Sequence, residues 1–317
     1  MLVTLQEIEE AATSIYKVMQ PSPQLSWPLL NQRCGCDVWV KHENHNPTGA
    51  FKVRGGLIYL GNLKQREPEV QGICAATRGN HGQSVAFAAA HNDLKAVIVV
   101  PEGNDPDKNA AMEALGAELV IHGCDFDESV ERAAELAQER ELHLLPSFHL
   151  DLVKGVATYA LELFRAVPDL DRVYVPIGLG SGASGVICAR NALGLDTEIV
   201  GVVSENANAY QLSFAAGKCI GTNSADTIAD GLAVRNPSQQ ALDMMLGQLE
   251  RIVDVSEQEI LDAIAHYFTD THNVAEGAGA AGLAALLKER EINQGKKVGV
   301  IFSGGNINKG LFKRALG

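Results

Sequence analysis

Lys52 has the setting in this sequence that most strongly indicates chemistry. It follows Phe51 at the start of a helical pattern, after a turn at residues 46–49. The dipole of a helix opposes a positive charge at its N-terminus. This potential and removal from water would both lower the pKa of the lysine amine. An amine with a lowered pKa suits a nucleophile or a base, so we take Lys52 as the candidate catalytic residue.

The glycine-rich stretch at residues 176–185 is the second candidate site. Its glycines let successive backbone amides point at one anion, and a helix N-terminus would add partial positive charge. No lysine follows as in a Walker loop, which argues against a triphosphate. Residues 180–185 also fit G-x-G-x-x-G, with Ser204 and Glu205 after the next strand, as in dinucleotide-binding proteins. A plain tight turn is a further interpretation.

Two other turns, each directly after an apolar run, are further candidate sites. In the first, Thr77, Asn80 and the amides from Gly79 to Gly82 could hold a carboxylate or bind a ring hydroxyl. The same residues could equally form only the turn, with His81 as a helix N-terminal residue. In the second, Ser303 and two glycines follow the run at residues 297–301. Polar groups at the carboxyl end of a buried strand point into a cleft.

The elements that must position these residues alternate between strand and helix. The expected strands are short, rich in valine and isoleucine, and closed by glycine or proline, which is typical of parallel strands buried on both faces. They lie at residues 37–41, 72–77, 96–101, 117–123, 172–178, 198–204 and 297–305. Helical patterns cover residues 81–92, 105–116, 126–141 and 277–291. Two capping boxes, at Thr4 and Ser256, mark further helix starts.

Repeated βα units predict an α/β protein built from doubly wound open sheets. We expect a small domain at residues 55–150 and a large domain formed by residues 1–54 and 151–317. The cleft between the domains, at the carboxyl ends of the strands, is the expected ligand site.

Composition narrows the class of protein. The chain has 317 residues, 46% of them hydrophobic and 21% charged, as in an ordinary globular enzyme. The net charge of −13, without a basic patch, argues against a nucleic-acid or anionic-membrane partner. The acidic N-terminus does not resemble a signal peptide, which predicts a cytoplasmic protein. The six cysteines are expected to be free thiols, since Cys34 and Cys36 alone are closely spaced.

Taken together, the four sites resemble those of the pyridoxal-phosphate enzymes of fold type II, the tryptophan-synthase-β type, and specifically the serine/threonine dehydratases. The resemblance rests on five ordered motifs that span nearly the whole chain: PTGAFKVRGG (47–56), TRGNHGQ (77–83), GLGSG (178–182), DTIADGLAV (226–234) and SGGN (303–306). It implies a pyridoxal 5′-phosphate cofactor in the cleft between the two domains. It also implies a homodimer.

The resemblance assigns roles to individual residues. Lys52 would carry the cofactor aldehyde and, once freed, remove the Cα proton. The cofactor phosphate would bind at Gly178, Leu179, Gly180, Ser181 and Gly182, and the ring at Phe51, Asn80 and Ser303. The substrate carboxylate would bind at Thr77, Arg78, Gly79, Asn80 and His81. A serine hydroxyl at the pyridine nitrogen cannot keep it protonated as an aspartate would, so the ring would be a milder electron sink.

The sequence also departs from the family pattern. Leu179 and Ser181 interrupt a phosphate loop that is mostly glycine in the family. Arg78 stands where related serine racemases have the serine that reprotonates Cα, which favours elimination over racemisation. Arg78 could read a second carboxylate or simply lie at the surface. We expect no metal near Glu205, because the acidic partner a few residues later is missing. Glu276 could approach the ring, although a helix-start glutamate is the commoner interpretation.

The favoured hypothesis is an ammonia-lyase that converts a β-hydroxy amino acid such as L-threonine or L-serine to a 2-oxo acid and ammonia. An enzyme for another substrate, such as hydroxyaspartate, and a serine racemase are alternatives with the same cofactor. A nicotinamide-dependent oxidoreductase is a remote alternative, because it leaves Lys52, Asn80 and Ser303 without a role. Only residues 307–317 follow the last motif, so we expect no C-terminal regulatory domain.

Overall fold

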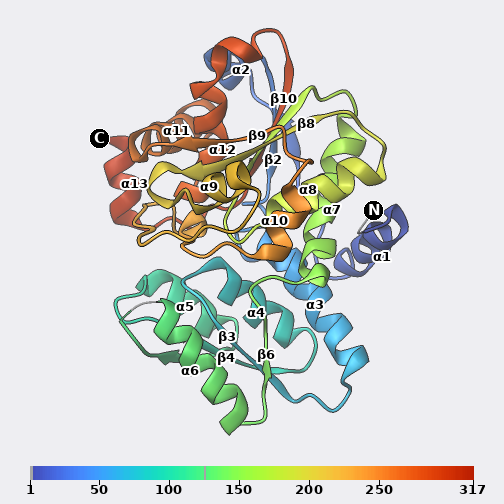
Figure 1. Cartoon of the computed structure of the whole chain (residues 1–317), viewed down its shortest axis with the longest axis vertical. Coiled ribbons are helices and arrows are strands. Elements are labelled where there is room, and N and C mark those ends of the chain that lie inside the picture. The colour runs from blue at the N-terminus through green and yellow to red at the C-terminus, as the bar shows by residue number, and fades with distance from the viewer. Residues whose placement is uncertain (1–2, 125) are drawn as a thin grey trace.

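The computed structural model describes residues 3–124 and 126–317, which form two sheets wrapped by helices (Figure 1). The six-stranded sheet has the order β1 (Gln24–Ser26), β2 (Asp37–His42), β10 (Lys297–Phe302), β7 (Arg172–Pro176), β8 (Glu198–Ser204) and β9 (Arg251–Val255). The four-stranded sheet has the order β5 (Glu118–Ile121), β4 (Lys95–Val100), β3 (Gly72–Ala76) and β6 (His143–Leu144). All neighbouring strands are parallel except β1 and β2. The predicted α/β fold with two open sheets is confirmed.

The seven strands expected from the sequence are all present, within a few residues of their expected ends. Every residue of β7 is buried, and so is every residue of β4 and β8 except the first, as parallel strands covered on both faces require. The sequence analysis missed β1, β6 and β9. The first two have only three and two residues, and Arg251 and Asp254 interrupt the apolar run of β9 at the sheet edge.

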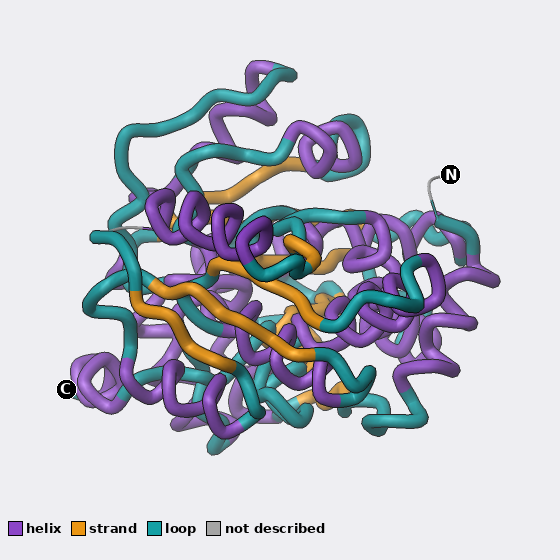
Figure 2. Tube along the Cα trace, turned by 90° about the horizontal axis from the view of Figure 1, so that it is seen from below, coloured by secondary structure: helices purple, strands orange, loops and turns teal. Residues whose placement is uncertain are grey.

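Helices connect the strands and cover both faces of the sheets (Figure 2). They are α1 (Leu5–Ile15), α2 (Pro28–Cys34), α3 (Lys52–Arg66), α4 (Asn80–Ala90), α5 (Pro106–Ala114), α6 (Phe126–Glu139), α7 (Leu150–Ala166), α8 (Ser181–Ala192), α9 (Ala209–Ala216), α10 (Gln239–Met245), α11 (Glu257–Thr271), α12 (Gly277–Lys288) and α13 (Lys309–Leu316). Short 3₁₀ turns occupy Glu205–Ala207, Asp230–Leu232 and Arg290–Asn293. Both capping boxes are formed, at Thr4 before α1 and at Ser256 before α11. Among the described residues, no helix combines the length and apolarity needed to cross a membrane.

A cluster of buried charges anchors the helix that begins at Lys52. Arg54, on the first turn of α3, donates to Glu43 at 2.8 and 3.0 Å and to Glu162 at 2.6 and 3.0 Å. Lys41 donates to Glu162 at 2.5 Å. Arg54, Lys41 and Glu43 have no exposed surface. Because each buried charge has an opposite partner, the cluster holds α3 to the segment after β2 and to α7 without an unpaired ion.

Candidate active site

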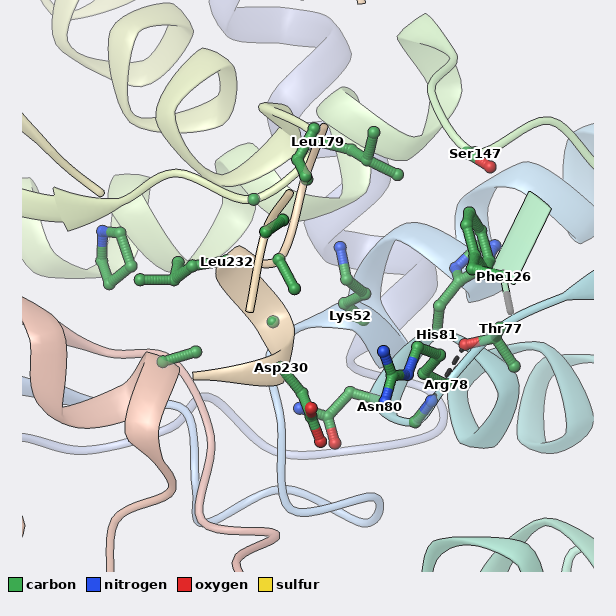
Figure 3. Close-up of a pocket in the computed structure, with 18 of the residues that line it drawn as sticks. Lys52, Thr77, Arg78, Asn80, His81, Phe126, Ser147, Leu179, Asp230 and Leu232 are labelled. Carbon is green, nitrogen blue, oxygen red and sulfur yellow. Dashed lines mark hydrogen bonds between the residues drawn. The ribbon is translucent and has the colours of Figure 1, made fainter. Parts of the chain in front are cut away.

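A cavity of about 480 Å³ lies between the two sheets, where β3, β7 and β10 end (Figure 3). Parallel strands bring their carboxyl ends to the same edge, which is where open α/β sheets bind ligands. The site residues expected from the sequence all line this cavity: Phe51, Lys52, Thr77, Arg78, Gly79, Asn80, His81, Gly178, Leu179, Gly180, Ser181, Gly182 and Ser303. Segments far apart in the chain therefore meet in one place, although their individual roles stay predictions.

Lys52 is the first residue of α3, and its side chain projects into the cavity (Figure 3). Its Nζ lies 4.9 Å from the centroid of the Phe51 ring, and no carboxylate among the described residues pairs with it. Burial lowers the pKa of this amine to about 8, while the charge of Glu276 acts in the opposite direction. The lowered pKa expected from the sequence is confirmed in direction. The Ser84 hydroxyl donates to the Lys52 carbonyl at 2.6 Å and ties this residue to α4.

The glycine loop at residues 178–182 presents backbone amides to the cavity. The amides of Gly178, Leu179 and Gly180 donate to no acceptor within the described part of the chain. The loop runs directly into the N-terminus of α8, which adds partial positive charge. Tyr210 donates its hydroxyl to the Leu179 carbonyl at 3.1 Å and so fixes the turn. Unpaired amides at a helix start form an anion site, and here the leucine takes part through its backbone.

Two positions of this loop require glycine. Gly180 has a φ of +97°, in the left-handed region that side chains rarely adopt. A Cβ on Gly178 would lie 2.1 Å from the Gly231 carbonyl oxygen. Gly185 has another function, since a Cβ there would lie 2.9 Å from the Ala157 amide of α7. The last glycine of the apparent dinucleotide motif therefore permits close packing of α8 against α7.

Asn80 is held from two sides at the start of α4. Its Nδ2 donates to Oε1 of Glu276 at 2.6 Å, and its Oδ1 accepts from Nδ2 of Asn306 at 2.8 Å. Asn306 also donates to the Thr48 carbonyl at 2.8 Å. These bonds fix the amide plane of Asn80 and leave one N–H of Nδ2 with no acceptor among the described residues, so a ligand can accept from it.

Glu276 has a different role from the one that its position in the sequence favours. It stands at the N-cap of α12, but its side chain caps no amide of that helix. The carboxyl is buried beside Asn80 in the cavity wall, with 7% of the residue exposed. Burial raises its pKa to about 7, and the charge of Lys108 acts in the opposite direction. Glu276 thus stands at a helix start, as the commoner interpretation has it, but its carboxyl accepts from Asn80 and caps no amide of α12.

The loop before α4 contributes Thr77, Arg78 and His81. Thr77 Oγ1 accepts from the Gly79 amide at 3.1 Å, which shapes the turn. Arg78 is exposed at the cavity and has no ion pair with any described residue. Burial lowers the pKa of His81 to about 3, with a smaller contribution from Lys52, so this imidazole is neutral. Arg78 is thus the cation of this loop that remains available to a ligand.

Ser303 follows β10 and is 6% exposed. Its backbone carbonyl accepts from the Phe51 amide at 3.0 Å, which places the serine next to the residue before Lys52. No protein partner of its hydroxyl is found within the described residues, so the group is available in the cavity.

The sequence analysis did not identify the ion pairs that cross the cavity. Lys108 on α5 donates to Asp230 at 2.8 Å, and Arg235 pairs with Asp127 of α6. Each pair joins the side of the four-stranded sheet to the side of the six-stranded sheet. Their residues lie more than 100 positions apart, and no local pattern marks them. Glu205, where a cation was considered, is exposed, and no group of three or more His, Cys, Asp or Glu that could hold a metal occurs in residues 3–124 and 126–317.

The chain matches one protein family and several known enzymes. The model of a family described as "Pyridoxal-phosphate dependent enzyme" matches residues 15–304. The L-threonine ammonia-lyase of Thermotoga maritima is 32% identical over 316 residues, which are 99% of this chain and 78% of that protein. The L-threo-3-hydroxyaspartate ammonia-lyase of Saccharomyces cerevisiae is also 32% identical, with 96% of this chain and 94% of that protein covered.

A solved structure agrees with these matches. A threonine deaminase from T.th. superposes with a TM-score of 0.90 at 31% identity, covering 96% of this chain and 99% of that one. Other relatives are longer: the chain spans 59% of the biosynthetic L-threonine dehydratase of Haemophilus influenzae, which is 32% identical to it.

Proposed function

The chain belongs to the pyridoxal-phosphate dependent enzymes, and from that premise we propose that it is a dehydratase that releases ammonia from a β-hydroxy amino acid. L-threonine and L-serine are the proposed substrates, and the products are a 2-oxo acid and ammonia. One observation carries the proposal: the Lys52 amine, with a pKa lowered to about 8, shares a cavity with a loop of free backbone amides.

The residues of the cavity fit the cofactor. An amine that carries an aldehyde has to be uncharged, and burial moves Lys52 toward that state. The amides of Gly178, Leu179 and Gly180 would hold the phosphate without a titratable group. Ser181 and Gly182, at the first turn of α8, would complete this loop. A cavity of about 480 Å³ is in the usual range for sites of cofactor size.

Residues of this chain would remove the Cα proton and bind the substrate carboxylate. When bound, the cofactor supplies the electron sink that makes the Cα–H bond of an amino acid acidic. With the cofactor bound, Lys52 would act as the general base that removes the Cα proton onto Nζ. The turn from Thr77 to His81 would bind the substrate carboxylate through the Thr77 hydroxyl and free amides. His81 stays neutral throughout, so it adds no charge beside Lys52.

Asn80, Ser303 and Phe51 would orient the ring. Asn80 would donate its remaining amide hydrogen to the ring oxygen, and its clamp by Glu276 and Asn306 keeps that hydrogen pointed at the cavity. The free hydroxyl of Ser303 would contact the ring nitrogen. Fixed groups of this kind lose little orientational freedom when the ligand binds.

A second candidate substrate is a β-hydroxy amino acid with two carboxylates, such as hydroxyaspartate. Two observations favour it: the exposed Arg78 has no ion pair with any described residue, and the relative from Saccharomyces cerevisiae is named for that substrate. An unpaired guanidinium binds a carboxylate through two parallel hydrogen bonds. Arg78→Met should then lower kcat/KM for hydroxyaspartate at least about tenfold while leaving threonine within a factor of a few. Equal losses for both substrates would contradict this assignment.

The assembly and the domain division are proposed on the same premise. Residues 55–150 would form a small domain, and residues 1–54 and 151–317 a large one, with Lys52 at the start of the helix between them. The family resemblance also implies a homodimer, and a cytoplasmic location is proposed with it. Sedimentation of the purified protein tests the dimer.

Covalent capture of the cofactor tests the proposed function. Purified protein should be yellow, and borohydride should attach the cofactor to the peptide that contains Lys52, as peptide mass spectrometry would show. Lys52→Ala should lose 2-oxo acid formation from threonine and serine, whereas Lys313→Ala, at an exposed lysine of α13, should keep it. A colourless protein, or attachment to another lysine, would overturn the proposal.

A further inference from the structure

A second cavity lies behind Glu276. It has a volume of about 190 Å³, and its walls come from four segments: α5, the loop of Asp230, the start of α12, and residues 306–311 around the beginning of α13. Glu276 lines both this cavity and the active cavity. Lys108 and Asp230 also border both. The carboxyl of Glu276 therefore stands in the partition between two spaces.

The contacts of Glu276 leave the carboxyl free to gain and lose a proton. Asn80 is its one side-chain hydrogen-bond donor among the described residues, through Oε1 at 2.6 Å. No ion pair within 4.0 Å holds it in one charge state within the described part of the chain. A Cβ on Gly304 would lie 2.5 Å from Oε1, so the glycine there leaves space that the carboxyl occupies. Most buried glutamates are paired, so an unpaired one between two cavities requires an explanation.

The charged groups around Glu276 come from three elements. Lys52 at the start of α3 and Lys108 on α5 favour the carboxylate, and Asp230 favours the carboxylic acid. The net effect, with burial as the largest cause, raises the pKa of Glu276 to about 7. Lys52 and Glu276 affect each other, since each charge shifts the pKa of the other group. The protonation states of these two groups are therefore coupled.

We propose that Glu276 is a proton-exchanging residue that connects the active cavity with solvent through the second cavity. The inference rests on the proposed function, in which Lys52 gains a proton from the substrate Cα in each turnover. Lys52 has to lose this proton before it can hold the cofactor again. Lys52 forms no ion pair with Glu276 within 4.0 Å, so a water molecule in the active cavity has to carry the proton. An N–H bond at Nζ breaks as an O–H bond forms on this water, which gives up another proton to a carboxylate oxygen of Glu276. The O–H bond then breaks to water in the second cavity, which returns Glu276 to the carboxylate.

Infrared spectroscopy of the cofactor-free protein tests the proton-holding step without any turnover. Wild-type protein should show the C=O stretch of a protonated carboxylic acid that disappears as the pH rises through about 7. Glu276→Gln keeps the size of the side chain and the acceptor for Asn80, and it should lack this band. A band that survives in Glu276→Gln overturns the proposal. If the protein forms no 2-oxo acid from any amino acid, the proposed function fails, while the infrared result still decides whether Glu276 holds the proton.

Kinetics of the holoenzyme test the route. Glu276→Gln should lower kcat about 100-fold with little change in KM, and acetate should restore part of the kcat of Glu276→Ala. Leu311→Trp narrows the second cavity and should lower kcat in a way that depends on solvent deuterium. The matched Lys313→Trp, on the same helix but outside the cavity, should not. An unchanged kcat in Glu276→Gln, no rescue by acetate, or equal kcat values for the two tryptophan variants would each overturn the proposal.

Discussion

Replacing Arg54 with methionine tests whether the buried charge cluster under α3 behaves as its geometry indicates. Arg54 makes hydrogen bonds to Glu43, Glu162, Thr158 and Ser22, and none of its surface is exposed. In Arg54→Met, Glu162 keeps the Lys41 ammonium at 2.5 Å. Glu43 loses its only ion-pair partner among the described residues and remains fully buried.

The expected loss of stability in Arg54→Met depends on the Glu43 carboxylate, which is left without a partner. Removing one partner of a buried ion pair costs about 3 to 5 kcal/mol, because the other charge stays in a medium of low polarity. We therefore expect Arg54→Met to lower the free energy of unfolding by about 3 to 5 kcal/mol. The second substitution Glu43→Gln, made in the same chain, should restore more than half of this loss, because it removes the orphaned charge.

Urea unfolding of the cofactor-free protein, followed by circular dichroism, measures both changes. Arg132→Met provides the control, because the ion pairs of Arg132 among the described residues are all with exposed carboxylates on α6. The urea midpoint of this variant should barely move. A loss under about 1 kcal/mol in Arg54→Met, or no recovery in the double variant, would refute the account of this cluster. Either result would also mean that the buried charges do not hold α3, and with it Lys52, in place.

Two further predictions concern the cavity itself. Gly178→Ala places a Cβ 2.1 Å from the Gly231 carbonyl oxygen, so the loop has to shift. Fluorescence titration should then show a cofactor affinity that is at least about tenfold weaker, which corresponds to about 1.4 kcal/mol. An unchanged Kd would contradict the proposed phosphate loop. Lys52→Met in the cofactor-free protein should raise the free energy of unfolding at neutral pH by about 1 to 3 kcal/mol, because burial disfavours the ammonium. The pKa of Lys52 is lowered on folding, so wild-type stability rises as the pH increases from about 8 to about 10.5. The difference in the free energy of unfolding between Lys52→Met and wild type should therefore shrink over that range. A difference that does not change with pH would refute the reasoning.

The sequence alone was sufficient for the fold class and for locating several of the residues that line the cavity. Valine-rich and isoleucine-rich runs closed by glycine or proline predict parallel strands, and their carboxyl ends predict where a ligand binds. Lys52, Asn80, Gly178 and Ser303 could be found because each stands at such a strand end or at the helix start that follows it, where local chemistry marks it. The missed strands β1, β6 and β9 are short or carry charged residues at sheet edges, and such strands have weak local patterns.

Only the tertiary structure decided which residues act on one another across the chain. Glu276 has the local pattern of a helix start, yet packing turns its carboxyl toward Asn80, which lies 196 positions earlier. Lys108 meets Asp230 across the cavity at a separation of 122 positions. Periodicity and turn chemistry depend on residues a few positions apart, so they cannot reveal such pairs. Burial, which raises the pKa of Glu276 and lowers that of Lys52, likewise exists only once distant segments have packed together.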